Sequence, residues 1–362
     1  MGGRRAFVTL LASEDYLPGL VALKNSFEQT ESSYQLVVLA PTTLSSDTQA
    51  FVTQKLQLQL KVEAEVSLPP SASQAQYACP LYRHCWLKLR LWEWYSDFDV
   101  LCYLDADMVV VKSIDSLLDA AEDWFLQGQL GAVLQCSCVV SRPEYSVDCI
   151  YNTTGGWGIV TDALRDTYQA SGATGEFGTK QGASCASDEL GTTTTTTTHP
   201  ADELHAKLAL RGANSCAKQY YFNAGLLLLR PSQETSGALF SSLSSSDVSH
   251  FRFAEQDFLN EFFRHDFFSL PWELNASKSL WACHRNTVWD FARVRILHFT
   301  MCKPWDLKNP GHKGYRILNE LWEAAYTCPE SLIGLILRAH RAEREKRKNI
   351  CNGNMNGWMD HV

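Results

Sequence analysis

The sequence contains no apolar run long enough to cross a membrane and no surplus of positive charge. Its longest apolar stretches, such as Ala224–Leu229 and Leu332–Leu337, are far shorter than the ~20 residues that a spanning helix needs. The formal net charge is -8 at pH 7, whereas a general nucleic-acid binder needs a basic face to neutralise phosphates. We therefore expect a protein that neither spans a membrane nor binds nucleic acid.

A secretion signal is also missing, and the closely spaced cysteines are those of Cys136-Ser137-Cys138. The apolar run that follows Arg5 is too short for a signal core, and Glu14 and Asp15 interrupt it. We therefore expect a cytoplasmic protein in a reducing compartment, where disulfides are rare. The 12 cysteines include no CxxC pair, so a zinc ribbon is poorly supported. We interpret these cysteines as buried or surface thiols.

The pattern of apolar residues predicts an α/β fold. In the first 125 residues, apolar runs alternate with segments of helical periodicity, as in Phe7–Leu11 followed by Tyr16–Phe27. This alternation is typical of a mostly parallel sheet covered by helices. A similar pattern resumes after Tyr220, with an expected strand over Ala224–Leu229 and an expected helix around Phe253–Phe263.

The segment between about residues 142 and 218 has a different composition. It is rich in Gly, Ser, Thr and Ala, and Thr192 to Thr198 is an unbroken threonine run. Such a tract has too little apolar surface to offset its ordering entropy, so we expect a largely disordered insertion. We interpret the serine-rich stretch Ser241–Ser249 as an exposed connection. The predicted domains are residues 1–310, interrupted by this insertion, and residues 311–362, which comprise C-terminal helices and a basic tail.

The strongest local signal is a pair of carboxylates, Asp105 and Asp107, at the end of the apolar run Val100–Leu104. Side chains two residues apart on a strand point the same way, and two such carboxylates repel each other unless a cation lies between them. Oxygen ligands of this kind suit Mg²⁺ or Mn²⁺ together with phosphate oxygens. The alternative is a solvated loop after a strand, because so short a motif also arises by chance.

A second signal is His298 at the end of an apolar strand, followed by Lys303 before a Pro-Trp pair. Imidazole can bind a divalent cation, and an ammonium can pair with phosphate oxygens. The alternative for His298 is a hydrogen-bonded core residue. Polar or small residues at the starts of strands and helices mark further candidates, each of which also fits a structural role: Lys88, Asn223, Ala224, Glu255 and Gln256.

The order of these segments resembles glycosyltransferase family 8, which includes glycogenin and plant galactinol synthase. The shared order is an N-terminal strand, a Lys-bearing helix, DxD, Asn-x-Gly, a Glu-Gln helix start and His-x4-Lys-Pro-Trp, over residues 5–140 and 219–306. The resemblance implies a GT-A fold with a Rossmann-like sheet that binds a UDP-sugar. It also implies Mn²⁺-dependent hexose transfer with retention of anomeric configuration.

The resemblance further implies a role for each matching residue. Asp105, Asp107 and His298 would bind Mn²⁺, and Lys303 would hold phosphate oxygens. The positions implied for the UDP part of the donor are Leu10, Ser13, Tyr16 and Ala106. Those implied for the sugar are Lys88, Asn223, Ala224, Glu255 and Gln256, with Lys88, Glu255 and Gln256 as the catalytic group. Either Glu255 is a nucleophile, or the acceptor attacks on the face from which UDP departs.

One departure from glycogenin bears on the acceptor. The stretch that corresponds to its self-glucosylated tyrosine, Ser277–Arg293, contains no tyrosine. Self-priming of the glycogenin kind is therefore not expected. The Thr-rich insertion and the expected cytoplasmic location favour galactose transfer from UDP-galactose to a glycan on a cytosolic protein, a Skp-one-type ubiquitin-ligase adaptor. The alternatives are transfer to myo-inositol as in galactinol synthase, glycogenin-like glucosyl transfer, and a pseudo-transferase that only binds nucleotide sugar. By analogy with glycogenin, we also expect a homodimer.

Overall fold

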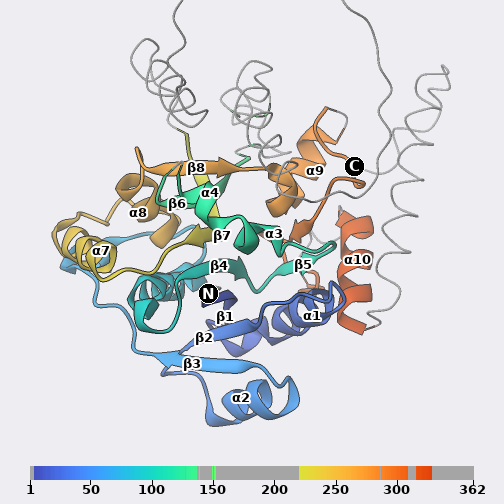
Figure 1. The fold of residues 1–362 in the computed structure, drawn as a ribbon, viewed down its shortest axis with the longest axis horizontal. Coiled ribbons are helices and arrows are strands. Elements are labelled where there is room, and N and C mark those ends of the chain that lie inside the picture. The colour runs from blue at the N-terminus through green and yellow to red at the C-terminus, as the bar shows by residue number, and fades with distance from the viewer. Residues whose placement is uncertain are drawn as a thin grey trace, which may run out of the picture.

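The computed structural model describes residues 4–126, 128–136, 138, 149, 151, 220–285, 287–308 and 315–327. A seven-stranded sheet forms the centre, with strand order β3-β2-β1-β4-β7-β6-β8 (Figure 1). Neighbouring strands are parallel except at β7, which runs antiparallel to both β4 and β6. The strands are β1 (Arg5–Leu10), β2 (Leu36–Pro41), β3 (Gln59–Glu63), β4 (Val100–Asp105), β6 (Leu130–Leu134), β7 (Phe222–Leu229) and β8 (Phe267–Leu270).

Alternating side chains on these strands build a core on each face of the sheet. In β4, Cys102 and Leu104 belong to one apolar cluster, and Leu101 and Tyr103 belong to the other. Apolar residues of α1, α3, α4 and α10 join the first cluster, and those of η4, α7 and α8 join the second. The chain thus has the mostly parallel sheet with helices on both faces that the sequence predicts.

The helices complete the layers on either side of the sheet. The longer ones are α1 (Leu17–Glu28), the 3-10 segment η4 (Pro80–Ser96), α7 (Gln233–Ser245), α8 (Glu255–Phe262), α9 (Lys278–His284) and α10 (Arg316–Thr327). Shorter ones are η1 (Glu14–Tyr16), α2 (Ser46–Ala50), the π-helical η2 (Phe51–Lys55), η3 (Pro70–Gln74), α3 (Ser116–Asp119), α4 (Ala121–Phe125) and η7 (Trp272–Asn275). None of the described helices combines the length and apolar character needed to cross a membrane.

A second, three-stranded sheet lies beside the carboxyl end of β4. It has the order β5-β10-β9 and consists of β5 (Met108–Val110), β10 (Ile296–His298) and β9 (Ala276–Ser277). A turn at Ala106 and Asp107 carries the chain from β4 into β5. Asp105 and Asp107 therefore flank a change of sheet rather than sharing one strand, and β10 brings His298 to the same place.

The serine-rich stretch is not wholly a connection, because α7 continues through Ser245, and its N-terminus is capped by Ser232, whose hydroxyl accepts a hydrogen bond from Thr235 N at 3.0 Å. The expected disordered insertion lies outside the described residues, apart from Cys149 and Tyr151.

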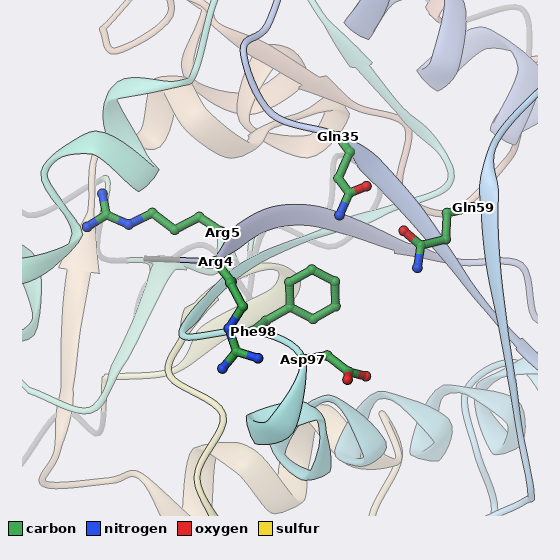
Figure 2. Close-up of a pocket in the computed structure, with 6 residues that line it drawn as sticks. All are labelled: Arg4, Arg5, Gln35, Gln59, Asp97 and Phe98. Atoms are coloured by element: carbon green, nitrogen blue, oxygen red, sulfur yellow. The ribbon is translucent and has the colours of Figure 1, made fainter. Parts of the chain in front are cut away.

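A hollow of about 520 Å³ opens at the amino ends of the parallel strands (Figure 2). It is lined by Arg4, Arg5, Gln35, Gln59, Asp97 and Phe98. Arg5 begins β1 and Gln59 begins β3, so this hollow lies at the end of the sheet opposite to Asp105. Ligands of open α/β sheets bind outside the carboxyl ends of the strands, so we expect the functional site at the end of the sheet that carries Asp105.

Candidate active site

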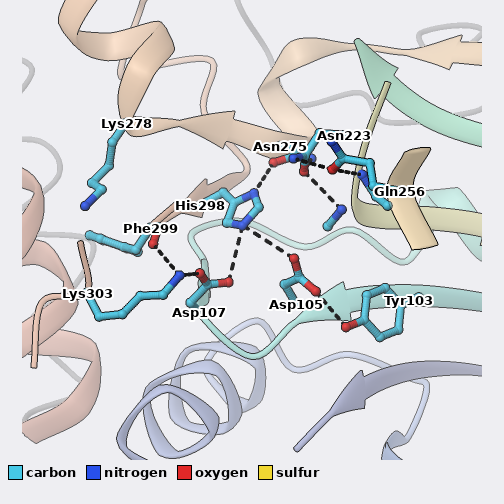
Figure 3. A network of polar contacts seen from close by, with 12 residues as sticks. Tyr103, Asp105, Asp107, Asn223, Gln256, Asn275, Lys278, His298, Phe299 and Lys303 are labelled. Carbon is cyan, nitrogen blue, oxygen red and sulfur yellow. Dashed lines mark hydrogen bonds and ion pairs between the residues drawn. The ribbon is translucent and has the colours of Figure 1, made fainter. Parts of the chain in front are cut away.

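Two carboxylates and one imidazole converge at the carboxyl end of β4 (Figure 3). His298 Nε2 lies 3.7 Å from Asp105 Oδ2 and 3.3 Å from Asp107 Oδ1. One ligand atom from each of the three residues falls within 4.8 Å of the others. His298 and Asp107 are buried and Asp105 is partly exposed, so the cluster is open to solvent on the Asp105 side.

Asn275 determines which nitrogen of His298 faces the carboxylates. The Asn275 amide nitrogen donates to Asn223 Oδ1 at 2.9 Å, so the Asn275 oxygen is the atom that lies 2.7 Å from His298 Nδ1. That oxygen can only accept, and Nδ1 therefore carries the proton. The lone pair of Nε2 then points at Asp105 and Asp107.

This donor set fits a divalent cation. Three groups that offer only lone pairs to one point repel each other unless a positive ion lies among them. A histidine whose outer ring nitrogen donates to a fixed oxygen is the usual arrangement of a metal-binding imidazole. Carboxylate oxygens with one imidazole suit Mg²⁺ or Mn²⁺. Asp105, Asp107 and His298 are therefore suited to hold the ion.

A glycine leaves the room that this cluster needs. A Cβ atom on Gly225 would lie 2.5 Å from His298 Cε1, 2.7 Å from Asn223 Oδ1 and 2.9 Å from Asp105 Oδ2. Contacts this short are not tolerated between side chains held from several directions. The Asn-x-Gly pattern noted in the sequence thus places the backbone of β7 directly against the imidazole.

Lys303 approaches the cluster from the other side. Its ammonium donates to Asp107 Oδ2 and, at 3.2 Å, to the Phe299 carbonyl. Burial favours the neutral acid, but the Lys303 ammonium holds the pKa of Asp107 well below its ordinary value. Between His298 and Lys303 the backbone turns through Met301, whose φ is 63°, a left-handed conformation that side chains seldom adopt.

Lys88 joins the cluster to the start of α8. Its Nζ lies 3.0 Å from Asp105 Oδ1, 2.8 Å from Glu255 Oε1 and 3.1 Å from the Ala224 carbonyl. Burial disfavours the charged amine, yet the two carboxylates raise the pKa of Lys88 above its ordinary value. Burial also raises the pKa of Glu255, and Lys88 opposes that rise. These three groups form one buried charge network with a single cation.

The backbone at the start of α8 is strained. Ala254, the residue before Glu255, has φ 51° and ψ -120°, a combination that favours glycine. Such conformations persist where surrounding contacts enforce them, and they cluster at functional sites. The strain directs Glu255 inward toward Lys88.

Gln256 and Asn223 extend the network along β7. The Gln256 oxygen accepts from Ala224 N at 2.9 Å and from Asn223 Nδ2 at 3.1 Å, and its nitrogen donates to the Tyr221 hydroxyl at 3.0 Å. Asn223 Oδ1 accepts from Gly225 N at 3.0 Å. A continuous chain of hydrogen bonds therefore runs from Tyr221 through Gln256, Asn223 and Asn275 to His298.

The residues expected around the uracil and ribose lie at the carboxyl end of β1. Leu10 is paired in register with Asp105, and Tyr16 packs edge-on against Trp305 with ring centroids 5.8 Å apart. The hydroxyl of Ser13 is buried and, within the described part of the chain, has no hydrogen-bond partner. Ala106 is buried between the two aspartates, where the helix residue Gly19 packs against its carbonyl.

The structure thus brings the predicted residues to one end of the sheet, and it adds three that sequence reasoning missed. Tyr103 donates its hydroxyl to Asp105 Oδ1 at 2.6 Å. Asn275 fixes the His298 tautomer, and Gln135 accepts from Asn223 at 2.8 Å. Asn275 and Gln135 lie in segments without a motif, and Tyr103, although it lies two residues before Asp105, reads in the sequence as one more residue of a buried strand.

Solved structures define the class of fold. The galactosyltransferase LgtC in complex with donor and acceptor sugar analogs is 16% identical, with 91% of this chain and 99% of that chain covered and a TM-score of 0.50. The bifunctional glycosyltransferase WbbM, in its apo structure, is 15% identical with a TM-score of 0.51; the match covers 93% of this chain but only 52% of WbbM. At these identities the likeness concerns the fold alone, which is the GT-A glycosyltransferase fold.

The family follows from the sequence comparison. The family model of glycosyl transferase family 8 matches residues 7–308, and this chain belongs to that family. Among its relatives are galactinol synthase 2 of Solanum lycopersicum, 27% identical over 83% of this chain and 72% of the relative, and galactinol synthase 1 of Ajuga reptans, 26% identical over 84% and 74%. The chain is accordingly a hexosyltransferase that uses a UDP-sugar, as the sequence order predicts.

Proposed function

We propose that this enzyme transfers galactose from UDP-galactose to an acceptor hydroxyl, with Mn²⁺ and with retention of anomeric configuration. The observation that carries the proposal is the convergence of Asp105, Asp107 and His298 Nε2 within 4.8 Å, beside the Lys303 ammonium. A diphosphate needs both a divalent cation and further positive charge as it leaves. Asp105, Asp107 and His298 supply ligands for the cation, and the Lys303 ammonium supplies the further positive charge.

On the phosphate side, Asp105, Asp107 and His298 would hold the Mn²⁺, and Asn275 keeps the His298 lone pair available. The bound ion would neutralise charge on the departing diphosphate. Lys303 already lies against Asp107, so on donor binding its ammonium needs only to shift toward a phosphate oxygen. Ser13 would donate its hydroxyl to the nucleoside, with Leu10, Tyr16 and Ala106 forming the remaining walls.

On the sugar side, we place Lys88, Asn223, Ala224, Glu255 and Gln256. Lys88 would orient the donor through Asp105. Gln256 accepts from the backbone N–H of Ala224 and from the side-chain amide of Asn223, and it would hold both groups against the hexose. The Glu255 side chain is 3% exposed and its oxygen is paired with Lys88 at 2.8 Å. A carboxylate so held is poorly placed to attack a sugar carbon, which supports attack by the acceptor on the face that UDP leaves.

The acceptor is either myo-inositol or a glycan on a cytosolic protein. The similarity to galactinol synthases, at 26–27% identity, supports myo-inositol. The missing tyrosine in Ser277–Arg293 is consistent with either a small polyol or a glycan on a Skp-one-type adaptor, and a cytoplasmic location would suit both. Homodimer formation stays a prediction.

The experiment is UDP release by the purified chain with Mn²⁺ across a panel of UDP-sugars, each with and without myo-inositol. The proposal predicts chelator-sensitive release from UDP-galactose above that from UDP-glucose. Stimulation by myo-inositol would assign the polyol acceptor, whereas stimulation only by a glycosylated adaptor would assign the protein glycan. Preference for UDP-glucose would overturn the donor assignment.

A further inference from the structure

Three cysteines and a histidine meet in the core, and none of them belongs to the charge network described above. They are Cys136, just after β6, then Cys138 and Cys149 in the chain that follows, and His284 at the end of α9. All four residues are buried, and one ligand atom from each lies within 4.8 Å of the others. Only Cys136 and Cys138 are close in sequence, and His284 follows Cys149 by 135 positions, so no CxxC pair marks the grouping.

The distances within this Cys3His cluster match a tetrahedral metal site. Cys138 Sγ and Cys149 Sγ lie 3.2 Å and 3.5 Å from His284 Nε2, and Cys149 Sγ lies 3.9 Å from Cys136 Sγ. Tetrahedral zinc with Zn–S of about 2.3 Å and Zn–N of about 2.0 Å separates two sulfurs by about 3.8 Å, and sulfur from nitrogen by about 3.6 Å. The cluster therefore has the size of a zinc coordination sphere.

A disulfide does not explain the arrangement. Bonded sulfurs lie about 2.05 Å apart, whereas Cys149 Sγ lies 3.9 Å from Cys136 Sγ. A disulfide would also leave the third sulfur and the imidazole without a reason to converge. Reduced, buried Cys3His sets with no water position are the usual composition of structural zinc sites.

We propose that Cys136, Cys138, Cys149 and His284 bind one structural Zn²⁺. Binding would release the thiol protons and leave three thiolates and one neutral imidazole on the ion. With four protein ligands the site is closed, so its role is to fix structure rather than to bind substrate.

The site joins two segments that border the active site. Gln135, next to Cys136, donates its amide nitrogen to the Cys136 carbonyl at 2.8 Å and accepts from Asn223. On the other side, α9 begins three residues after Asn275, the partner of His298. The Zn²⁺ would link the segment after β6 to α9, and it would thereby restrict the positions of Gln135 and Asn275. It would also anchor the start of the long insertion.

The test is the zinc content of the full-length chain, purified without added metal and treated with a weak chelator. We expect one zinc per chain in the wild type and in two controls, Cys102→Ala and Asp105→Asn. Cys102 is a buried thiol of the same apolar cluster but is not a member of the Cys3His set, and Asp105 belongs to the other site. Cys149→Ser should lose most of the zinc.

A second measurement guards against misfolding of Cys149→Ser. Wild-type chain exchanged with Co²⁺ should show thiolate-to-cobalt charge-transfer absorption, and a mercurial reagent should release the zinc as it reacts with the thiols. A wild-type chain that carries no zinc and gives no thiolate absorption with Co²⁺ would overturn the proposal. So would Cys149→Ser with undiminished zinc. Both outcomes are independent of whether UDP-galactose is the donor.

Discussion

Asn275 Oδ1 lies 2.7 Å from His298 Nδ1 and thereby fixes the side of the imidazole that faces Asp105 and Asp107. Replacing Asn275 by Ala frees the ring to change tautomer and rotate. Loss of such an outer partner typically weakens metal binding about 10–100-fold. We expect the Mn²⁺ concentration needed for half-maximal UDP binding to rise by about this factor.

Asn275→Asp is the matched variant, because a carboxylate still accepts from Nδ1 while losing the bond to Asn223. It should retain more Mn²⁺ affinity than Asn275→Ala. Equal losses in both variants would mean that Asn275 acts through Asn223 and not through the imidazole.

Gly225 offers a steric test of the same cluster. In Gly225→Ala the new Cβ would lie 2.5 Å from His298 Cε1, so the imidazole must shift. We expect Mn²⁺-dependent UDP binding to fall at least about tenfold, which corresponds to about 1.4 kcal/mol. Titration calorimetry would measure it.

Gly237→Ala provides the control, because a Cβ built there meets no heavy atom of the described residues within 4 Å beyond its chain neighbours and its own helix backbone. This position is inside α7, where Ala stabilises a helix by about 0.5–1 kcal/mol relative to Gly. Unchanged UDP binding with a raised melting temperature is expected. Intact binding in Gly225→Ala would refute the crowding argument.

The Lys88 network predicts a strong effect on stability. Lys88→Met leaves the carboxylates of Asp105 and Glu255 near each other without the cation between them. Removing one partner of a buried ion pair costs about 3–5 kcal/mol, which denaturant unfolding would detect. Adding Glu255→Gln to Lys88→Met should recover part of the loss. Strict additivity of the two substitutions would contradict direct coupling.

The contact between Lys303 and Asp107 predicts that the stability of the metal-free chain depends on pH. Because Lys303 lowers the pKa of Asp107, the ionised carboxylate stabilises the folded state above the ordinary carboxyl pKa of about 3.9, and this contribution is lost as the pH falls below it. Lys303→Met should reduce stability at neutral pH and flatten its decline in acid. A decline in acid as steep as that of the wild type would show that Lys303 does not hold Asp107 ionised. The same variant should weaken UDP binding.

The sequence predicts the central strands and the main site residues, but it does not predict every helix. Strands such as β4 and β7 are found because each is a continuous apolar run, and Asp105, Asp107, His298 and Lys303 are found because their order along the chain is shared with a family. The helix α7 is missed because serine is a weak helix former, although burial of Leu239 and Leu243 stabilises it.

Contacts between distant segments could not be predicted. Asn275 lies 23 residues from His298, and Gln135 lies 88 residues from Asn223, with no motif to link either pair. The Cys3His cluster is hidden for the same reason, since His284 follows Cys149 by 135 positions. The domain division near residue 310 stays a prediction, because residues 328–362 lie outside the described part.

The most direct test of the metal assignment is UDP binding with and without Mn²⁺, in wild type and in Asp105→Asn. We expect Mn²⁺ to tighten UDP binding in the wild type and Asp105→Asn to remove most of this gain, while zinc content stays unchanged. Binding of UDP with Mn²⁺ by Asp105→Asn as tight as that of the wild type would contradict the assignment of Asp105, Asp107 and His298 as the cation site.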